Sequence, residues 1–458
     1  MNGVSCGTMV ALSCALALGA CTSSVTSSAH CDAAGLTAAL AAARSGDVVD
    51  VGVCRIDGSF VVPDGVLLRG VSPASSVLTS SSGIAVELHA GASLESIAIE
   101  SSGHAALVAR TAGAVTISGV TVTPTRGIGI GLEHASATLR DVAVVGPITS
   151  ATAPTTATPG DATRTATFGL VAISATLDAH AVTVRGFASA GIALVDTTSM
   201  LSDSVIDTCV GVGVGVSGGS ATLLRVDVRG TSHGSGPDAA ALSVDRMATL
   251  DTTELRVSDN QGLGIFANGA GPQSHHQLVA ASNGGAGVWT QASGALTIDG
   301  AGSAIDDNSF AGVVMVNGAF HVTDTVISQT RMATLGTVTA ADGLQIINPS
   351  ADSTLEDSVV YSNPRVGMVV DGAGSDHMSF HVTSMIATGT GTALGCVTQN
   401  GGFADGVWDM NIVRNDVAAA NDTAFETANH SIGVVGVVGP GMIVGLGSLS
   451  SGGLASLL

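Results

Sequence analysis

Short runs in which apolar residues alternate with small or polar ones recur along most of the chain. One kind of run follows a Gly, as in Gly191-Ile192-Ala193-Leu194. A second kind begins some residues later, as in Ala221-Thr222-Leu223-Leu224. Alternation with a period of two predicts a strand with one buried side. Because strands this short are not stable alone, we expect each to pair with the equivalent strand of the next repeat.

The runs recur at a regular distance. The Gly or Ala that opens each repeat stands at positions 169, 191, 213, 241, 264, 287, 312, 343 and 367, so that successive steps are 22 to 31 residues long. A base step of 22 residues with occasional longer ones indicates one solenoid coil with loop insertions. The sequence therefore predicts a stack of coils with one continuous apolar column inside.

An Asn stands four residues before the Gly in several repeats. These residues are Asn260, Asn283, Asn308 and Asn363, and Cys209 occupies the same place in its own repeat. An Asn side chain can donate to the next Asn of a stack and accept from the previous one, and it tolerates a tight corner. We expect the four Asn residues to form a structural ladder along one edge.

The pattern Asn-x-x-x-Gly followed by an aliphatic residue resembles the repeat of the pectin-lyase-like proteins. The resemblance is clearest between Gly169 and Gly372 and implies an all-β fold, a single-stranded right-handed parallel β-helix solenoid of about a dozen coils. A helical cap is expected at its N-terminus, over residues 33–43, where Leu36 and Leu40 share a face. The family includes lyases, hydrolases, epimerases, tailspikes and adhesins, so the resemblance implies a fold and no single activity.

The first residues resemble a bacterial lipoprotein signal. Residues 1–20 are apolar and small, and they end in Leu-Gly-Ala before Cys21, which would carry the lipid. No Lys or Arg precedes the apolar run, which departs from the usual pattern, and an ordinary secretory peptide is the alternative. We expect a signal peptide (1–20), a Ser/Thr-rich tether (21–30) and a β-helix domain (31–458). The protein would then be lipid-anchored at the outer membrane or cell surface, or otherwise secreted or periplasmic.

The cysteines outside the signal peptide divide by position. Cys31 precedes the expected helix and Cys54 follows the first strand, so outside the cytoplasm they are expected to form a disulfide that ties the cap to the first coils. Cys209 and Cys396 are many coils apart, and we expect each to be a single buried thiol.

Composition excludes some partners. The net charge is -21 and only 11% of the residues are charged, with no basic stripe of the kind that binds nucleic acid. The segment Ser431–Leu458 has no charged side chain, but Gly439-Pro440-Gly441 divides it into runs too short to cross a membrane. We expect this segment to form a last coil or a strand cap.

The longer steps locate a candidate binding surface. Extra residues lie at 147–167, 230–240 and 330–342, each before the residue that opens the next coil, and so they should emerge from one edge. Insertions on one face commonly carry binding residues. The candidate binding residues are Asp161, Arg164, His233, Asp238, Arg331 and Asp342. Tolerated drift in surface loops is the alternative.

The patterns that would indicate catalysis or metal binding are weaker than the repeat pattern. Outward acidic residues should form two columns, one with Asp178, Asp251 and Glu356, the other with Asp141, Asp203, Asp324 and Asp357. Such columns are compatible with calcium or with an acid/base pair, although a solvated face is the simpler interpretation. Asp306-Asp307 resembles the aspartate pair of polygalacturonase-like enzymes, but no Gly-His-Gly accompanies it, and turn residues are the better interpretation. We expect no catalytic or metal residues.

The sequence favours a membrane-anchored extracytoplasmic β-helix protein that binds extended glycans or surface partners without catalysis. The alternative is a polysaccharide lyase or glycoside hydrolase whose motifs have diverged. A purely structural spacer is a third hypothesis. The expected partners are a polysaccharide or a surface protein, with no nucleic acid and with membrane contact through the lipid anchor alone. No cofactor is expected, and calcium is the alternative.

Overall fold

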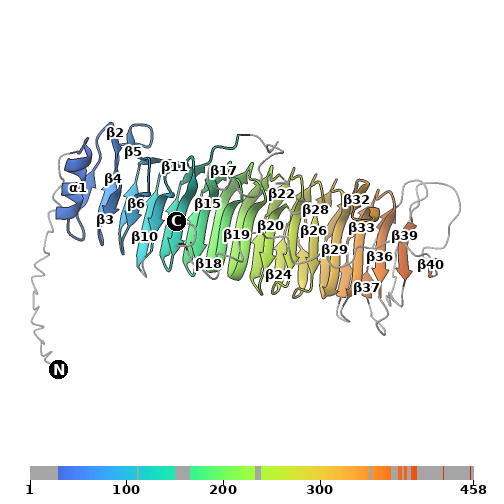
Figure 1. Ribbon diagram of the computed structural model, residues 1–458. Helices are drawn as coiled ribbons and strands as arrows, with labels where there is room; N and C mark the ends of the chain where they lie inside the picture. The colour runs from blue at the N-terminus through green and yellow to red at the C-terminus, as the bar shows by residue number, and fades with distance from the viewer. Residues whose placement is uncertain are drawn as a thin grey trace, which may run out of the picture.

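The chain forms a right-handed parallel β-helix with a helix at its N-terminal end, as the sequence predicted (Figure 1). The computed structural model describes residues 29–110, 113–149, 166–232, 239–349, 353–372, 380–383, 386–388, 394–399, 426–427 and 454. Each coil contributes three strands, and equivalent strands of successive coils pair in parallel to make three ladders.

The first ladder contains the strands that follow the Gly of each repeat. It comprises β3 (Phe60–Val62), β6 (Ile84–Leu88), β9 (Ala105–Ala109), β12 (Gly127–Glu133), β15 (Ala166–Ile173), the starts of β18 (Ala190–Asp207) and β19 (Val212–Arg229), β20 (Ala240–Asp245), β23 (Leu263–Asn268), β26 (Val288–Gln291), β29 (Phe310–Gly318), β33 (Val338–Pro349), β36 (Val366–Asp371), β39 (Leu394–Gln399) and β40 (Glu426–Thr427).

The second ladder contains the strand that comes next in each coil. It comprises β1 (Val48–Asp50), β4 (Leu67–Arg69), β7 (Ser93–Glu95), β10 (Ala114–Ser118), β13 (Ser136–Arg140), β16 (Thr176–His180), the middles of β18 and β19, β21 (Thr249–Thr253), β24 (Gln273–His276), β27 (Leu296–Asp299), β30 (Phe320–Thr323), β34 (Ser353–Glu356) and β37 (Phe380–Thr383).

The third ladder completes each coil. It comprises β2 (Cys54–Asp57), β5 (Ser76–Ser80), β8 (Ala98–Ser101), β11 (Thr121–Pro124), β14 (Ala143–Val145), β17 (Thr183–Arg185), the ends of β18 and β19, β22 (Arg256–Ser258), β25 (Val279–Ala281), β28 (Ser303–Asp306), β31 (Thr325–Ser328), β35 (Val359–Tyr361) and β38 (Ile386–Thr388). One further strand, β32 (Ala333–Leu335), pairs antiparallel with the start of β33.

The inward side chains of the three ladders form one apolar core along the solenoid, with Leu107, Leu139 and Val144 fully buried among many others. The corner between the second and third ladders repeats a left-handed residue in coil after coil, for instance Asp141, Asp203 and Asp324. Asp and Asn adopt this conformation at lower cost than most residues because a short polar side chain can bond locally.

The N-terminal cap is the helix α1 (Ala33–Ala42), in which Leu36 and Leu40 are the buried residues. Asp32 caps it by accepting a hydrogen bond from the N–H of Gly35 at 2.7 Å. The expected disulfide between Cys31 and Cys54 is present and joins the start of the helix to β2. The helix therefore covers the open end of the core, as a solenoid requires.

The Asn ladder is present, with one interruption. Asn260 Nδ2 donates to Asn283 Oδ1 at 2.9 Å, and Asn283 Nδ2 donates to Asn308 Oδ1 at 2.8 Å. Asn363 is not the next member, because the coil between contributes Thr330, whose hydroxyl donates to Asn363 Oδ1 at 2.6 Å. Cys209 occupies the same place in its coil and is a buried free thiol, whereas the side chain of Cys396 lies outside the described residues.

Candidate functional site

The three insertions leave the solenoid at the same corner, between the third and the first ladder, which we call the insertion edge. The first lies between β14 and β15, the second between β19 and β20, and the third between β31 and β33. Three ladder steps separate β15 from β20 and four separate β20 from β33. At about 4.8 Å per step, the roots of the insertions are roughly 14 and 19 Å apart. Asp161, Arg164, His233 and Asp238 lie outside the described residues.

The third insertion is a β-hairpin that folds over the solenoid. It is made by β32 and the start of β33, and its residues Ala333, Leu335 and Val338 pack against outward apolar side chains of the first ladder. Arg331 lies just before β32. Its Nε is 3.2 Å from Asp307 Oδ1, and another nitrogen donates to the backbone oxygen of Asn283 at 3.1 Å. Arg331 therefore fastens the hairpin to the edge while half of its side chain stays exposed.

Asp342 requires a correction, because we expected it at the end of a surface loop. It lies inside β33 and is fully buried. Its carboxylate pairs with Arg365 and accepts from Gln345 Nε2 at 2.9 Å. Burial raises the pKa of Asp342, and Arg365 opposes that rise. The hairpin starts the ladder strand earlier than the sequence suggested, so Asp342 serves packing and is out of reach of a surface ligand.

The outward side of the first ladder is apolar and buried, which the sequence analysis missed. Val108, Val171, Phe266, Trp289 and Val314 point away from the core, yet each has almost no exposed surface. The ring of Trp289 stacks on Phe310 with centroids 6.3 Å apart. The signal was present in the sequence, since strands buried on both sides lose the alternation of apolar and polar residues.

The aspartate pair at 306–307 is part of the corner. Ser328 Oγ donates to Asp306 Oδ1 at 2.6 Å, and Ser282 Oγ donates to Asp307 Oδ2 at 3.0 Å. Asp307 has a left-handed backbone, with φ 52°. Both carboxylates are thus held by hydroxyls of neighbouring coils, which is the turn role that the sequence favoured.

The acidic columns are only partly as expected. Asp178 and Asp251 share one register position, but Glu356 belongs to a different one, two residues further along its strand. Asp178 pairs with Arg140, and Asp203 binds Arg225 at 2.6 and 2.8 Å. The Arg225 guanidinium lowers the pKa of Asp203. Within the described part of the chain, no three His, Cys, Asp or Glu side chains gather as metal ligands would.

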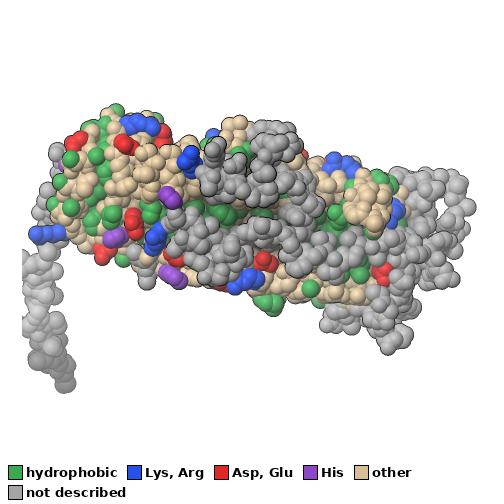
Figure 2. All heavy atoms as spheres, in the orientation of Figure 1, with side chains coloured by type: hydrophobic (Ala, Val, Ile, Leu, Met, Phe, Trp, Pro, Cys, Tyr) green, Lys and Arg blue, Asp and Glu red, His purple; other side chains and the backbone are tan. Residues whose placement is uncertain are grey.

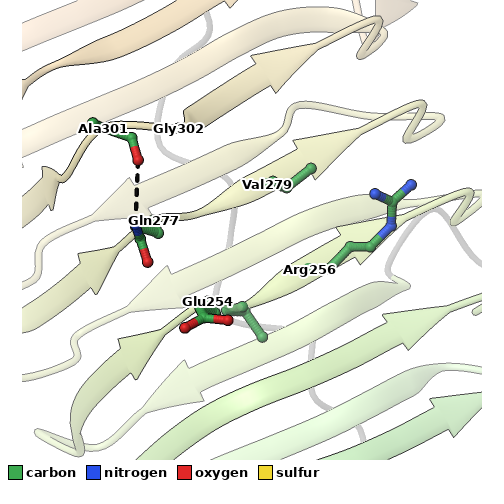
Figure 3. A pocket seen from close by; sticks show the side chains of 7 residues that line it. Glu254, Arg256, Gln277, Val279, Ala301 and Gly302 are labelled. Atoms are coloured by element: carbon green, nitrogen blue, oxygen red, sulfur yellow. Dashed lines mark hydrogen bonds between the residues drawn. The ribbon is translucent and has the colours of Figure 1, made fainter.

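A shallow depression of about 430 Å³ lies at the corner between the second and third ladders (Figure 3). Glu254, Arg256 and Gln277 line it, and Gln277 Nε2 donates to the backbone oxygen of Ala301 at 3.3 Å. The Arg256 side chain points away from Glu254, and its Nε donates to Ser258 Oγ at 3.2 Å. One carboxylate in an open depression is not the facing pair that glycoside hydrolysis uses.

Charged side chains are scattered on the visible face of the described residues and form no continuous stripe (Figure 2). In the same described part of the chain, no helix combines the length and apolar character needed to cross a membrane. The insertion edge is set apart from the other two corners by the three insertions that leave the solenoid there.

No protein-family model and no characterised protein matches the chain. Among solved structures, the A-module of a mannuronan C-5 epimerase from Azotobacter vinelandii is 12% identical over 82% of this chain and 95% of its own, with a TM-score of 0.39. An alginate lyase from a Paenibacillus species is 12% identical over 82% of this chain and 95% of its own, with a TM-score of 0.27. The catalytic unit of an α-1,3-glucanase from Streptomyces thermodiastaticus is 14% identical over 81% of this chain and 60% of its own, with a TM-score of 0.34. Similarity at this level assigns the chain to no enzyme family.

Proposed function

We propose that the protein is an extracytoplasmic β-helix protein that binds an extended glycan along the insertion edge without cleaving it. The observation that carries the proposal is the placement of three insertions at one corner, across roughly 33 Å from the first root to the last. A span of that length matches a polymer better than a compact substrate. The carboxylates described beside the edge, at Asp306, Asp307 and Asp342, are already engaged by neighbouring side chains.

The charge of the chain narrows the class of glycan. With a net charge of -21, the protein repels polyanions at low ionic strength. Neutral or cationic polysaccharides are therefore the expected ligands, and polyuronates should bind only where calcium bridges the two sets of carboxylates.

A polysaccharide panel tests this proposal. The protein is immobilised and scored for retention of neutral, cationic and acidic polysaccharides, with and without calcium, and the supernatants are assayed for new reducing ends and unsaturated products. Retention without products is the expected result. Product formation would instead identify a lyase or hydrolase with diverged motifs, and no retention of any polysaccharide would contradict glycan binding and favour a surface protein as partner or a spacer role.

A loop exchange then tests the location of the glycan-binding site. Replacing residues 233–238 with Gly and Ser residues of the same number removes His233 and Asp238 and should weaken retention at least tenfold. Met247→Ser is the matched control, because this exposed side chain lies at the corner between the first and second ladders, away from the insertion edge. Equal retention of the polysaccharide by both variants would contradict a glycan-binding site at the insertion edge.

A further inference from the structure

The outer face of the first ladder is apolar and buried, so other atoms of the protein must pack on it. Its outward apolar side chains form two clusters, one over β9 to β19 and one over β20 to β33. Ala193, Val314 and Ala311 have no exposed surface, and Trp289 has 1%. An outward side chain can be buried only by atoms that lie on top of the sheet.

The described residues provide only part of that cover. Over the second cluster, the β32–β33 hairpin contributes Ala333, Leu335 and Val338 at the end near β29 and β33. The first cluster consists of first-ladder residues with a single exception, Leu454. This residue is four positions before the last residue, Leu458, yet it packs beside coils near the start of the solenoid.

Leu454 makes specific contacts on this face. Its N–H donates to Glu133 Oε1 at 2.9 Å. A Cβ atom placed on Gly131 would stand 2.8 and 3.0 Å from the two Leu454 methyl carbons. Val108 and Val171 occupy the same register position in the coils before and after Gly131. The glycine thus leaves a gap in an outward apolar column, and the Leu454 side chain fills it.

The rest of the C-terminal segment has the length and composition for the remaining cover. Eleven ladder steps separate β12 from β40, or about 53 Å. The 27 residues from Thr427 to Leu454 can extend over about 90 Å, so the chain can return along the ladder. Residues 431–458 carry no charged side chain. Burying them against an apolar face leaves no charge without a partner.

We propose that the C-terminal segment, residues 428–458, docks along the outer face of the first ladder and seals both apolar clusters, with Leu454 at its anchored end. This differs from the last coil or strand cap that the sequence suggested. The segment makes the face unavailable to partners and keeps an apolar surface, which would otherwise favour self-association, out of water.

A cross-link in the full chain tests whether Leu454 lies next to Gly131. Gly131→Cys combined with Leu454→Cys should form an intramolecular disulfide in high yield under mild oxidation, because a Cβ on residue 131 would lie next to the Leu454 side chain and Gly131 tolerates an L residue at its backbone conformation. Gly131→Cys combined with Leu449→Cys is the matched control, since five residues move the thiol by about 16 Å along an extended chain. A disulfide between two chains would mean that a second copy occupies the face and would overturn the proposal, as would equal yields from both pairs.

Trp289 reports on the second cluster. In a Trp408→Phe background it is the sole tryptophan. Ending this chain after His430 should shift its emission to longer wavelength and raise its quenching by acrylamide several-fold. Emission and quenching that stay unchanged in a folded, monomeric truncated chain would show that something else covers this cluster. If the truncated chain does not fold, the cross-link result decides the proposal.

Discussion

At the scale of single residues, His275 is the clearest example of a polar group held inside the apolar core. It is fully buried in β24, its Nδ1 lies 2.9 Å from the hydroxyl of Thr252, and its Nε2 has no partner among the described residues. Burial lowers the pKa of His275 to about 4. The side chain is therefore mostly neutral in the folded protein at pH values above about 4.

This burial predicts a loss of stability in acid. Below pH 6.5 the unfolded chain gains a proton at His275 that the folded chain does not take up until about pH 4, so the free energy of unfolding falls as the pH drops through that window. Between pH 7 and pH 4.5 the expected loss is about 2 kcal/mol. The measurement is urea unfolding at both pH values for the wild type and His275→Gln.

The variant comparison is needed because other groups act in the opposite direction. Burial raises the pKa of Asp227, Asp245 and Asp342, and these carboxyls make the folded state relatively more stable as the pH falls. The difference between wild type and variant isolates the histidine. An equal response of both proteins to pH would show that His275 is not the origin of the loss.

Nothing in the local sequence shows that this histidine is buried. It stands next to His276, but the pleat places the two side chains on opposite sides of the strand, and His276 is the exposed one that bonds to Asp299 at 2.8 Å. The same limit applies to Asp342. Neither its burial nor its pairing with Arg365, 23 residues away in sequence, leaves a local pattern.

At the scale of elements, the Asn ladder explains why the motif joins an Asn to a Gly four residues later. A Cβ atom on Gly264 would stand 2.9 Å from Asn283 Nδ2, and one on Gly287 would stand 2.7 Å from Asn308 Nδ2. The Gly of one coil therefore makes room for the Asn of the next. Cys209 and Thr231 meet Gly191 and Gly213 in the same way, which is why smaller side chains can take the position.

Removing a central Asn should lower the free energy of unfolding. In Asn283→Ala, Asn260 and Asn308 lose a partner, and the backbone oxygen of Val257 loses the donor at 3.2 Å. We expect a loss of about 3 kcal/mol in the free energy of unfolding, since each buried polar group left unpaired costs about 1–3 kcal/mol. Chemical denaturation measures it, with Asn268→Ala at the half-buried end of β23 as the control. A change below about 0.5 kcal/mol at Asn283 would contradict a structural role for the ladder.

The elements were predictable to different degrees. The stacking of coils, the helix at the N-terminal end and the Asn corner follow from local periodicity and turn chemistry, and the sequence predicted them. The third strand of each coil was not predicted, because the sequence shows only two recurring strand patterns in each repeat. The β32–β33 hairpin was interpreted as part of a loop, because its apolar residues Leu335 and Val338 pack on a face whose existence depends on the stacking of distant coils. Tertiary contacts of this kind have no signature within one repeat.

At the scale of the whole molecule, the location of the protein depends on how its N-terminal end is anchored. We propose that Cys21 carries a lipid and that residues 21–30 form the tether, of which residues 21–28 lie outside the described residues. Cys21→Ser should move the protein from the membrane fraction to the soluble fraction and abolish labelling with a radioactive fatty acid, because the acyl chains are the expected anchor. Labelling that persists in the variant would contradict the proposed lipid site.

We propose that the ligand at the insertion edge is extended and contacts several insertions at once. Affinity as a function of ligand length tests it most directly, using a graded series of fragments of whichever polysaccharide the protein retains. Fragments shorter than about 14 Å should bind weakly, and affinity should rise with length until the ligand spans roughly 33 Å, then level off. Full affinity for the shortest fragments would place the site within one coil and contradict the account.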